Sequence, residues 1–85
     1  MARDASERAT REHVRALRER IETLTPRERE VLDRVVQGKL NKEIAAELGI
    51  HERTVKLHRT ALTTKLEVQS VAQLTRLVQE AGLLP

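Results

Sequence analysis

The sequence predicts an all-α fold, and three observations support this class. Its 85 residues include only three glycines and two prolines, while the helix-favouring residues Glu, Arg, Leu and Ala are common. Apolar residues recur at spacings of three and four, which is the period of an amphipathic helix. Capping signals for helix starts recur along the chain, as at Thr25 and Ser70. A chain of this length suffices for one small domain and not for two.

Residues 3–22 are expected to form a polar linker helix. Apolar residues recur along it at helical spacing, but the seam that they form is shorter than two heptads. Seams this short usually pack against their own domain rather than form a coiled coil. We therefore expect a linker helix within residues 1–22 and a separate helical domain over residues 23–85. The seam comprises Val14, Leu17, Ile21 and Leu24.

The second helix is expected to begin after Thr25. Pro26 suits the first helical position, and Glu28, three residues after Thr25, completes a capping box. Gly38 is well placed to end this helix. The apolar residues of its buried stripe are Val31, Leu32, Val35 and Val36.

Asn41 is the expected N-cap of the third helix. Gly49 supplies the positive φ that a tight turn between two helices often needs, and the apolar Ile50 fills the core beside that turn. The inner face of this short helix comprises Ile44, Ala45 and Leu48.

The fourth helix is expected from about Glu52 to Leu66, and its segment carries the net positive charge of the chain. Residues 51–66 hold four basic side chains against one acidic side chain, so this segment accounts for the whole net charge of +3. Two short helices joined by a tight turn with a glycine, the second of them basic, are typical of a helix-turn-helix. The predicted fold is therefore a four-helix helix-turn-helix domain preceded by a linker helix.

The two faces of the fourth helix differ in their chemistry. Basic and hydroxyl side chains share the outer face with one leucine, opposite an aliphatic stripe, as in a helix that docks into the major groove of DNA. The inner residues are Val55, His58, Leu62 and Leu66. The outer residues are Arg53, Lys56, Leu57, Thr60 and Thr64, with Arg59 and Thr63 at their flank.

Ser70 and Gln73 form a second capping box, which opens a last helix that runs to about Ala81. Its apolar residues occupy two adjacent arcs. One arc suffices for packing within the domain, so the other is either a partner surface or part of a broad core. The first arc comprises Leu74, Leu77 and Ala81, and the second comprises Val71, Thr75 and Val78.

The composition excludes several classes of function. The chain has no Phe, Tyr or Trp, whereas modules that bind RNA or single strands stack bases on aromatic rings. It has no cysteine, so neither a disulfide framework nor a thiolate metal site can form. His51 and His58 lie seven residues apart and lack an obvious third ligand, so we expect no metal site. We expect no catalytic residue, no cofactor and no enzymatic activity.

No apolar run approaches the ~20 residues that a membrane span needs, and the N-terminus lacks the apolar stretch of a signal peptide. The absence of cysteine fits a reducing compartment. We therefore expect a protein of the bacterial cytoplasm without a membrane partner.

An ordered set of short motifs, LTPRE, REVL, NKEIA, LGI and TVKLH, lies within Leu24–Leu66. This set resembles the DNA-binding output domain of FixJ/LuxR-type regulators, and the last helix extends the resemblance to roughly residues 23–84. Within this family it looks most like the response regulators of the NarL/FixJ type, in which a phosphorylatable receiver domain and a linker helix precede the output domain. The chain is too short to include a receiver domain, so we expect an isolated output domain or a naturally short regulator.

The resemblance implies a homodimer that binds inverted half-sites on double-stranded DNA, with RNA polymerase as a further partner. It places Lys56, Leu57 and Thr60 at the positions that face bases. It assigns dimerisation to the last helix, and we provisionally put Val71, Thr75 and Val78 at that interface. The positions that match phosphate contacts of the family, together with basic and hydroxyl side chains beside the base-facing positions, are Asn41, Lys42, Arg53, Thr54, Arg59, Thr64 and Lys65.

Three residues depart from the family pattern. His51 stands where Ser or Thr usually caps the recognition helix, and histidine caps poorly. Leu57 replaces the usual valine. Glu67 stands where glycine is common, and a glutamate at positive φ is mildly strained.

Two other functions remain open at this stage. A promoter-reading domain like that of a sigma factor shares the helix-turn-helix, although the extra capped helix after Leu66 speaks against it. A basic helical module that binds an acidic protein explains the charge. It does not explain why Lys56, Leu57 and Thr60 share the outer face.

Overall fold

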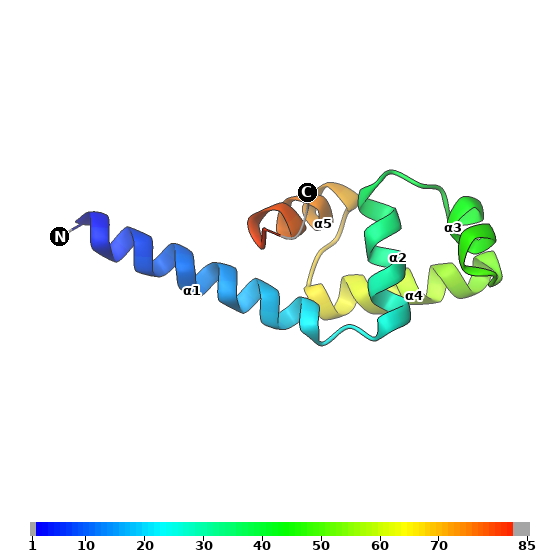
Figure 1. Ribbon diagram of the computed structural model, residues 1–85, viewed down its shortest axis with the longest axis horizontal. Coiled ribbons are helices and arrows are strands. Elements are labelled where there is room, and N and C mark those ends of the chain that lie inside the picture. The colour runs from blue at the N-terminus through cyan, green and yellow to red at the C-terminus, as the bar shows by residue number, and fades with distance from the viewer. Residues whose placement is uncertain (1, 83–85) are drawn as a thin grey trace.

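The computed structural model describes residues 2–82, with side chains from Thr10 onward, so the last three residues of the predicted domain lie outside the described part. Within this part the chain forms helices and no strand, which confirms the predicted all-α class. Figure 1 shows α2 to α5 gathered around one centre, while the N-terminal half of α1 extends away from it. The helices are α1 (Ala2–Glu22), α2 (Pro26–Val36), α3 (Asn41–Leu48), α4 (Glu52–Leu66) and α5 (Val71–Glu80).

All five helices contribute to a single hydrophobic core. Leu17 and Ile21 of α1 are buried in it, and Val14 and Leu24 of the same seam are half-buried. The short seam thus packs on its own domain, as the sequence indicated. Because the C-terminal half of α1 completes this core, the predicted boundary between residues 22 and 23 falls inside one packing unit.

Polar contacts also fasten the C-terminal half of α1. The Arg18 guanidinium donates from Nε to the carbonyl oxygen of Ala81 over 2.8 Å, so it binds one of the carbonyl groups at the end of α5. Arg20 forms an ion pair of 3.1 Å with Glu67, just after α4. The linker helix is therefore anchored to the ends of both α4 and α5.

The start of α2 confirms the predicted capping box. The Glu28 N–H donates to Thr25 Oγ1 over 3.1 Å, and the Thr25 N–H donates to Glu28 Oε1 over 2.9 Å. The helix ends at Val36, two residues before Gly38, which has the positive φ of 84°.

The predicted N-cap of α3 is wrong by one residue. Leu40 holds the extended cap conformation, and Asn41 is the first helical residue. The Glu43 carboxylate reaches back and accepts the Leu40 N–H over 2.8 Å. Asn41 does not cap because its backbone is already helical, and its side-chain oxygen instead accepts a hydrogen bond from Arg59 of α4.

The turn between α3 and α4 follows the sequence prediction. Gly49 is left-handed at φ 67°, and α4 spans the predicted Glu52–Leu66. His51 precedes α4 without a side-chain cap bond, in line with its poor capping chemistry. Glu67 ends α4 at φ 57°, so a glutamate does occupy the left-handed position where the family favours glycine.

The start of α5 contains half of the predicted capping box. Ser70 Oγ accepts the N–H of Gln73 over 3.1 Å. The Gln73 side chain, however, accepts from the N–H of Gln69 and not from that of Ser70. The helix ends at Glu80, and Ala81 is its C-cap.

Candidate nucleic-acid interface

The inner face of α4 fixes this helix on the domain and leaves its outer face open. Val55, Leu62 and Leu66 are fully buried against the rest of the core. On the opposite face Lys56, Leu57 and Thr60 are all exposed, as expected. The leucine side chain keeps 64% of its area in contact with solvent. A single exposed leucine is common on protein surfaces, so the polar and charged side chains around it define the character of this face.

Four cations on α3 and α4 differ from those of α2 in their ion pairing. No described carboxylate forms an ion pair with Lys42, Arg53, Lys56 or Arg59. Lys42, Arg53 and Lys56 are also exposed. Their charge is therefore available to an anion from outside the domain.

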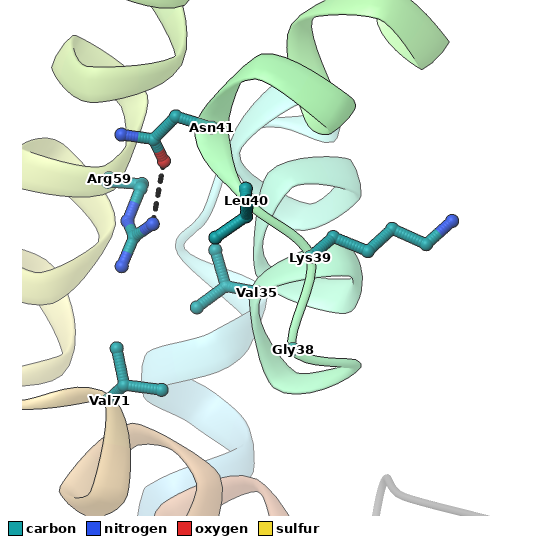
Figure 2. Close-up of a pocket in the computed structure, with 7 residues that line it drawn as sticks. All are labelled: Val35, Gly38, Lys39, Leu40, Asn41, Arg59 and Val71. Atoms are coloured by element: carbon teal, nitrogen blue, oxygen red, sulfur yellow. Dashed lines mark hydrogen bonds between the residues drawn. The ribbon is translucent and has the colours of Figure 1, made fainter.

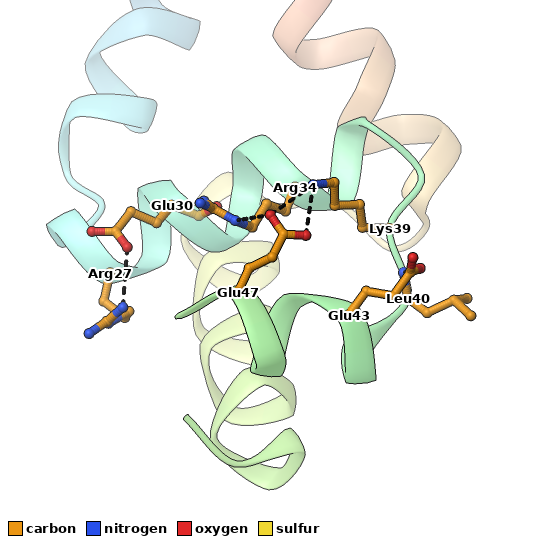
Figure 3. Close-up of polar contacts among 7 residues, drawn as sticks. All are labelled: Arg27, Glu30, Arg34, Lys39, Leu40, Glu43 and Glu47. Carbon is orange, nitrogen blue, oxygen red and sulfur yellow. Dashed lines mark hydrogen bonds and ion pairs between the residues drawn. The ribbon is translucent and has the colours of Figure 1, made fainter. Parts of the chain in front are cut away.

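The cations of α2 and its following loop are already paired (Figure 3). Glu47 of α3 accepts from Lys39 over 2.7 Å and from Arg34 over 3.3 Å. The hydrogen bond from Lys39 is the main reason why the pKa of Glu47 lies below its ordinary value. Arg27 pairs with Glu30 over 3.2 Å. This surface offers little net charge to a distant partner.

A hydrogen bond joins the two helices of the helix-turn-helix. Arg59 of α4 donates from Nη1 to Asn41 Oδ1 over 2.6 Å. Both residues line a groove of about 300 Å³, together with Leu40 and Val71. Figure 2 shows the bond at one side of this groove. Because the amide is neutral, it orients the guanidinium without cancelling its charge. Both residues were expected to touch phosphates, and the structure brings them together.

The threonines of the predicted site fall into two groups. The Thr64 hydroxyl donates to the carbonyl oxygen of Thr60 over 2.8 Å, so its only proton is already used within α4. A phosphate oxygen needs a donor, and Thr64 can serve it only after this bond breaks. Thr54 is half-buried in the first turn of α4, and Thr60 is exposed.

Lys65 has a partner inside the protein. Its ammonium lies 2.6 Å from Glu28 Oε1, and Glu28 is the buried charged residue of the described core. Burial raises the pKa of Glu28, but hydrogen bonds from Lys65 and from the Thr25 N–H outweigh it, so the pKa falls below its ordinary value. Lys65 was expected among the phosphate contacts, whereas its ammonium points at Glu28 in the structure.

Comparison with known proteins identifies the family. The sequence model described as bacterial regulatory proteins of the luxR family matches residues 22–78. The chain belongs to that family. This domain is therefore a DNA-binding helix-turn-helix domain of transcription regulators, and the luxR family is not a known family of enzymes.

Several known proteins resemble this domain over most of its length. Nodulation protein W of Bradyrhizobium diazoefficiens is 40% identical over 95% of this chain and 36% of its own length. The crystal structure of full-length FixJ from B. japonicum matches 93% of this chain and 39% of its own at a TM-score of 0.86 and 33% identity. The response regulator StyR matches 89% of this chain and 38% of its own, with a TM-score of 0.85 and 45% identity. The chain thus spans little more than a third of these relatives.

The three residues predicted for the dimer interface differ in their exposure. Val71 is 46% exposed at the start of α5, and Thr75 is half-buried. Val78 is only 4% exposed and belongs to the core of the monomer. Its arc is broad enough to reach that core, so Val78 is not accessible to a second copy in this structure.

The described residues contain no group of three or more side chains suited to a metal ion, and His58 is half-buried on α4. None of the helices in the described part combines the length and apolar character that a bilayer span requires.

Two side-chain pairings in the structure were not expected from the sequence. Glu28 was recognised only as a cap, although it also binds a lysine 37 residues away. Asn41 was assigned a capping role, although its oxygen binds Arg59. Local sequence signals could predict neither contact, because each contact depends on how two helices cross. The one available hint was Lys65 itself, a cation in the last turn of α4 close to its apolar face.

Proposed function

We propose that this domain is the output domain of a bacterial two-component response regulator and reads double-stranded DNA with α4 in the major groove. The observation that supports this most is the exposed outer face of α4, where Lys56, Leu57 and Thr60 lie among cations without ion-pair partners. A major groove admits one α-helix and presents a distinct pattern of donors, acceptors and methyl groups at each base pair.

Each of the three base-facing residues supplies a different kind of contact. The Lys56 ammonium donates to guanine O6 or N7, and the Leu57 side chain packs on a thymine methyl group. The Thr60 hydroxyl serves as donor or acceptor, so it contributes to binding without fixing one base. The exposure of all three on α4 supports this assignment.

We assign the phosphate contacts mainly to the cations that lack an ion-pair partner. Arg53 flanks the base-facing residues on α4, Lys42 lies in the first turn of α3, and Asn41 orients Arg59 between the two helices. We place the half-buried Thr54 beside them. Such contacts position the helix in the groove and supply affinity without reading sequence. Thr64 and Lys65 leave the set, because the Thr64 hydroxyl proton is used within α4 and the Lys65 ammonium is paired with Glu28.

We also propose that two copies bind inverted half-sites through α5. Val71, exposed at the start of that helix, and the neighbouring Thr75 are the candidate contacts. One recognition helix touches only a few base pairs, so a second half-site about one turn away adds the missing affinity. In a longer regulator, a receiver domain and RNA polymerase are the further partners, and the bacterial cytoplasm is the location.

Selection of bound sequences from a random duplex pool tests this function. We expect enrichment of one motif with inverted symmetry. Enrichment of a motif without symmetry would contradict the dimer and retain the reading role of α4. No enrichment over random DNA would contradict sequence reading and favour the basic protein-binding module. The luxR-family match and the additional helix α5 disfavour the sigma-factor-like alternative.

A further inference from the structure

We propose that Glu28 and Lys65 are positioning residues for DNA reading: their ion pair holds the end of α4 on the start of α2, and Lys65 contacts no phosphate. This inference rests on the proposed function. It removes one basic residue from the DNA contacts and gives the domain's buried carboxylate a role in recognition.

The pair joins two elements that are far apart in the chain. Lys65 Nζ lies 2.6 Å from Glu28 Oε1, and 37 residues separate them. The same carboxylate oxygen accepts the N–H of Thr25 over 2.9 Å. One oxygen atom therefore receives a donor from the cap of α2 and a donor from the last turn of α4.

Burial makes the pair hard to exchange for a phosphate. The Glu28 side chain is 7% exposed, and that of Lys65 is 36% exposed. Moving the ammonium to DNA would leave a buried carboxylate without its cation, which costs far more than breaking an exposed pair. A phosphate at the solvated DNA surface gives only a screened attraction in return. The pair is therefore expected to persist in the complex.

The direction of this contact matters for the recognition helix. Burial of Val55, Leu62 and Leu66 sets the depth of α4 and its approximate rotation, but apolar contacts are not directional and tolerate small rotations. A hydrogen-bonded ion pair is directional, because its donor must point at the acceptor. Lys65 thus limits the rotation of α4 about its own axis. This rotation decides where the side chains of Lys56 and Thr60 meet the base edges.

A matched pair of lysine substitutions separates positioning from phosphate binding. Lys65→Met keeps the aliphatic stem and removes the charge, and Lys42→Met makes the same change at an exposed lysine without an ion pair. Binding to the selected operator and to random duplex is measured as a function of salt, after circular dichroism has shown that each variant is folded.

For Lys42→Met, the slope of log K against log salt should fall by about 0.9, because one phosphate contact is lost. For Lys65→Met, the slope should stay unchanged, while the preference for operator over random duplex falls about tenfold, the discrimination of one base contact. A reduced slope with unchanged preference for Lys65→Met would show a phosphate ligand and overturn the inference.

Two further variants distinguish loss of the ion pair from a folding defect. Glu28→Gln retains an oxygen that can accept the Thr25 N–H, keeps every cation of the domain and should still lower the operator preference. Lys65→Arg, which can pair with the carboxylate, should restore most of the preference lost in Lys65→Met. An unchanged preference in Glu28→Gln would overturn the positioning role.

The pair can also be tested without DNA. In urea unfolding, the effects of Glu28→Gln and Lys65→Met should be non-additive, because each removes the same contact. Additive effects would overturn the inference even if the domain reads DNA normally. A wild-type domain that prefers no sequence, with a non-additive cycle, would instead reject the proposed function and the positioning role together, while retaining the ion pair as a structural contact.

Discussion

Helices α2 and α4 are both rich in basic residues, yet they present different charges to their surroundings. Arg27, Arg29 and Arg34 of α2 each lie within 4.0 Å of a carboxylate. On α4, no described carboxylate pairs with Arg53 or Lys56. The two helices therefore differ in uncompensated charge and not in whether they carry basic side chains, and we use this difference to assign the DNA-facing surface to α4.

The physical reason is the range of the electric field. A paired cation and carboxylate form a dipole, whose field falls faster with distance than that of a single charge and is screened further by salt. An unpaired cation attracts the phosphate backbone and releases a counterion when it binds. The surface of α2 is thus self-neutralised, whereas that of α4 is left available to a polyanion.

The largest expected effect separates the two faces of α4. Leu62→Ala should destabilise the domain by about 2–5 kcal/mol, because it empties a fully buried position. Leu57→Ala, on the exposed face, should change stability by less than ~0.5 kcal/mol and lower operator affinity instead. Urea unfolding and fluorescence anisotropy measure the two quantities. Equal losses of stability would contradict the division into an inner and an outer face.

Lys56→Ala should weaken operator binding by about 1–3 kcal/mol, because it removes a base contact. Binding to random duplex should fall much less, since non-specific binding uses the phosphates. Titration of both DNAs at one salt concentration compares the losses. If the two losses were the same, Lys56 would be a phosphate contact and not a base-reading residue.

Val71→Asp should lower the affinity for an operator with two half-sites by about tenfold, because a carboxylate replaces an apolar contact between the two copies. The affinity for a single half-site should hardly change. Thr75→Ala, one turn along α5, is a milder control. An unaffected two-site operator would reject α5 as the dimer contact.

The smallest effect compares the cations of α4 and α2 directly. Arg53→Gln should reduce the slope of log K against log salt by about 0.9, whereas Arg27→Gln should leave it unchanged. The reason is that Arg27 is already engaged with Glu30. Anisotropy titrations from low to moderate salt determine both slopes. Equal slopes for the two variants would remove ion pairing as the criterion for the DNA-facing surface.

Local signals in the sequence predicted the helices and the faces of α4 well. The capping box of Thr25 and Glu28, the glycine turn at Gly49 and the span of α4 are all present in the structure. These features depend on residues a few positions apart. Periodicity could therefore predict which side of α4 is buried.

Such local signals could not predict the tertiary contacts. Asn41 lies inside α3 and binds Arg59 instead of capping the helix, and Val78 is buried because its arc reaches the core. Lys65 resembled its basic neighbours in sequence, yet it binds Glu28. Each difference follows from the packing of helices distant in the chain, which no local pattern encodes. The same packing places part of α1 inside the predicted domain.

Chemical-shift mapping of the backbone amides with the selected operator tests the central claim most directly. We predict shifts in the first turns of α3 and α4 and along the outer face of α4 at Lys56, Leu57 and Thr60. The amides around Arg27, Glu30 and Arg34 on α2 should stay unchanged. Shifts centred on that paired surface, with an unperturbed α4, would contradict the account.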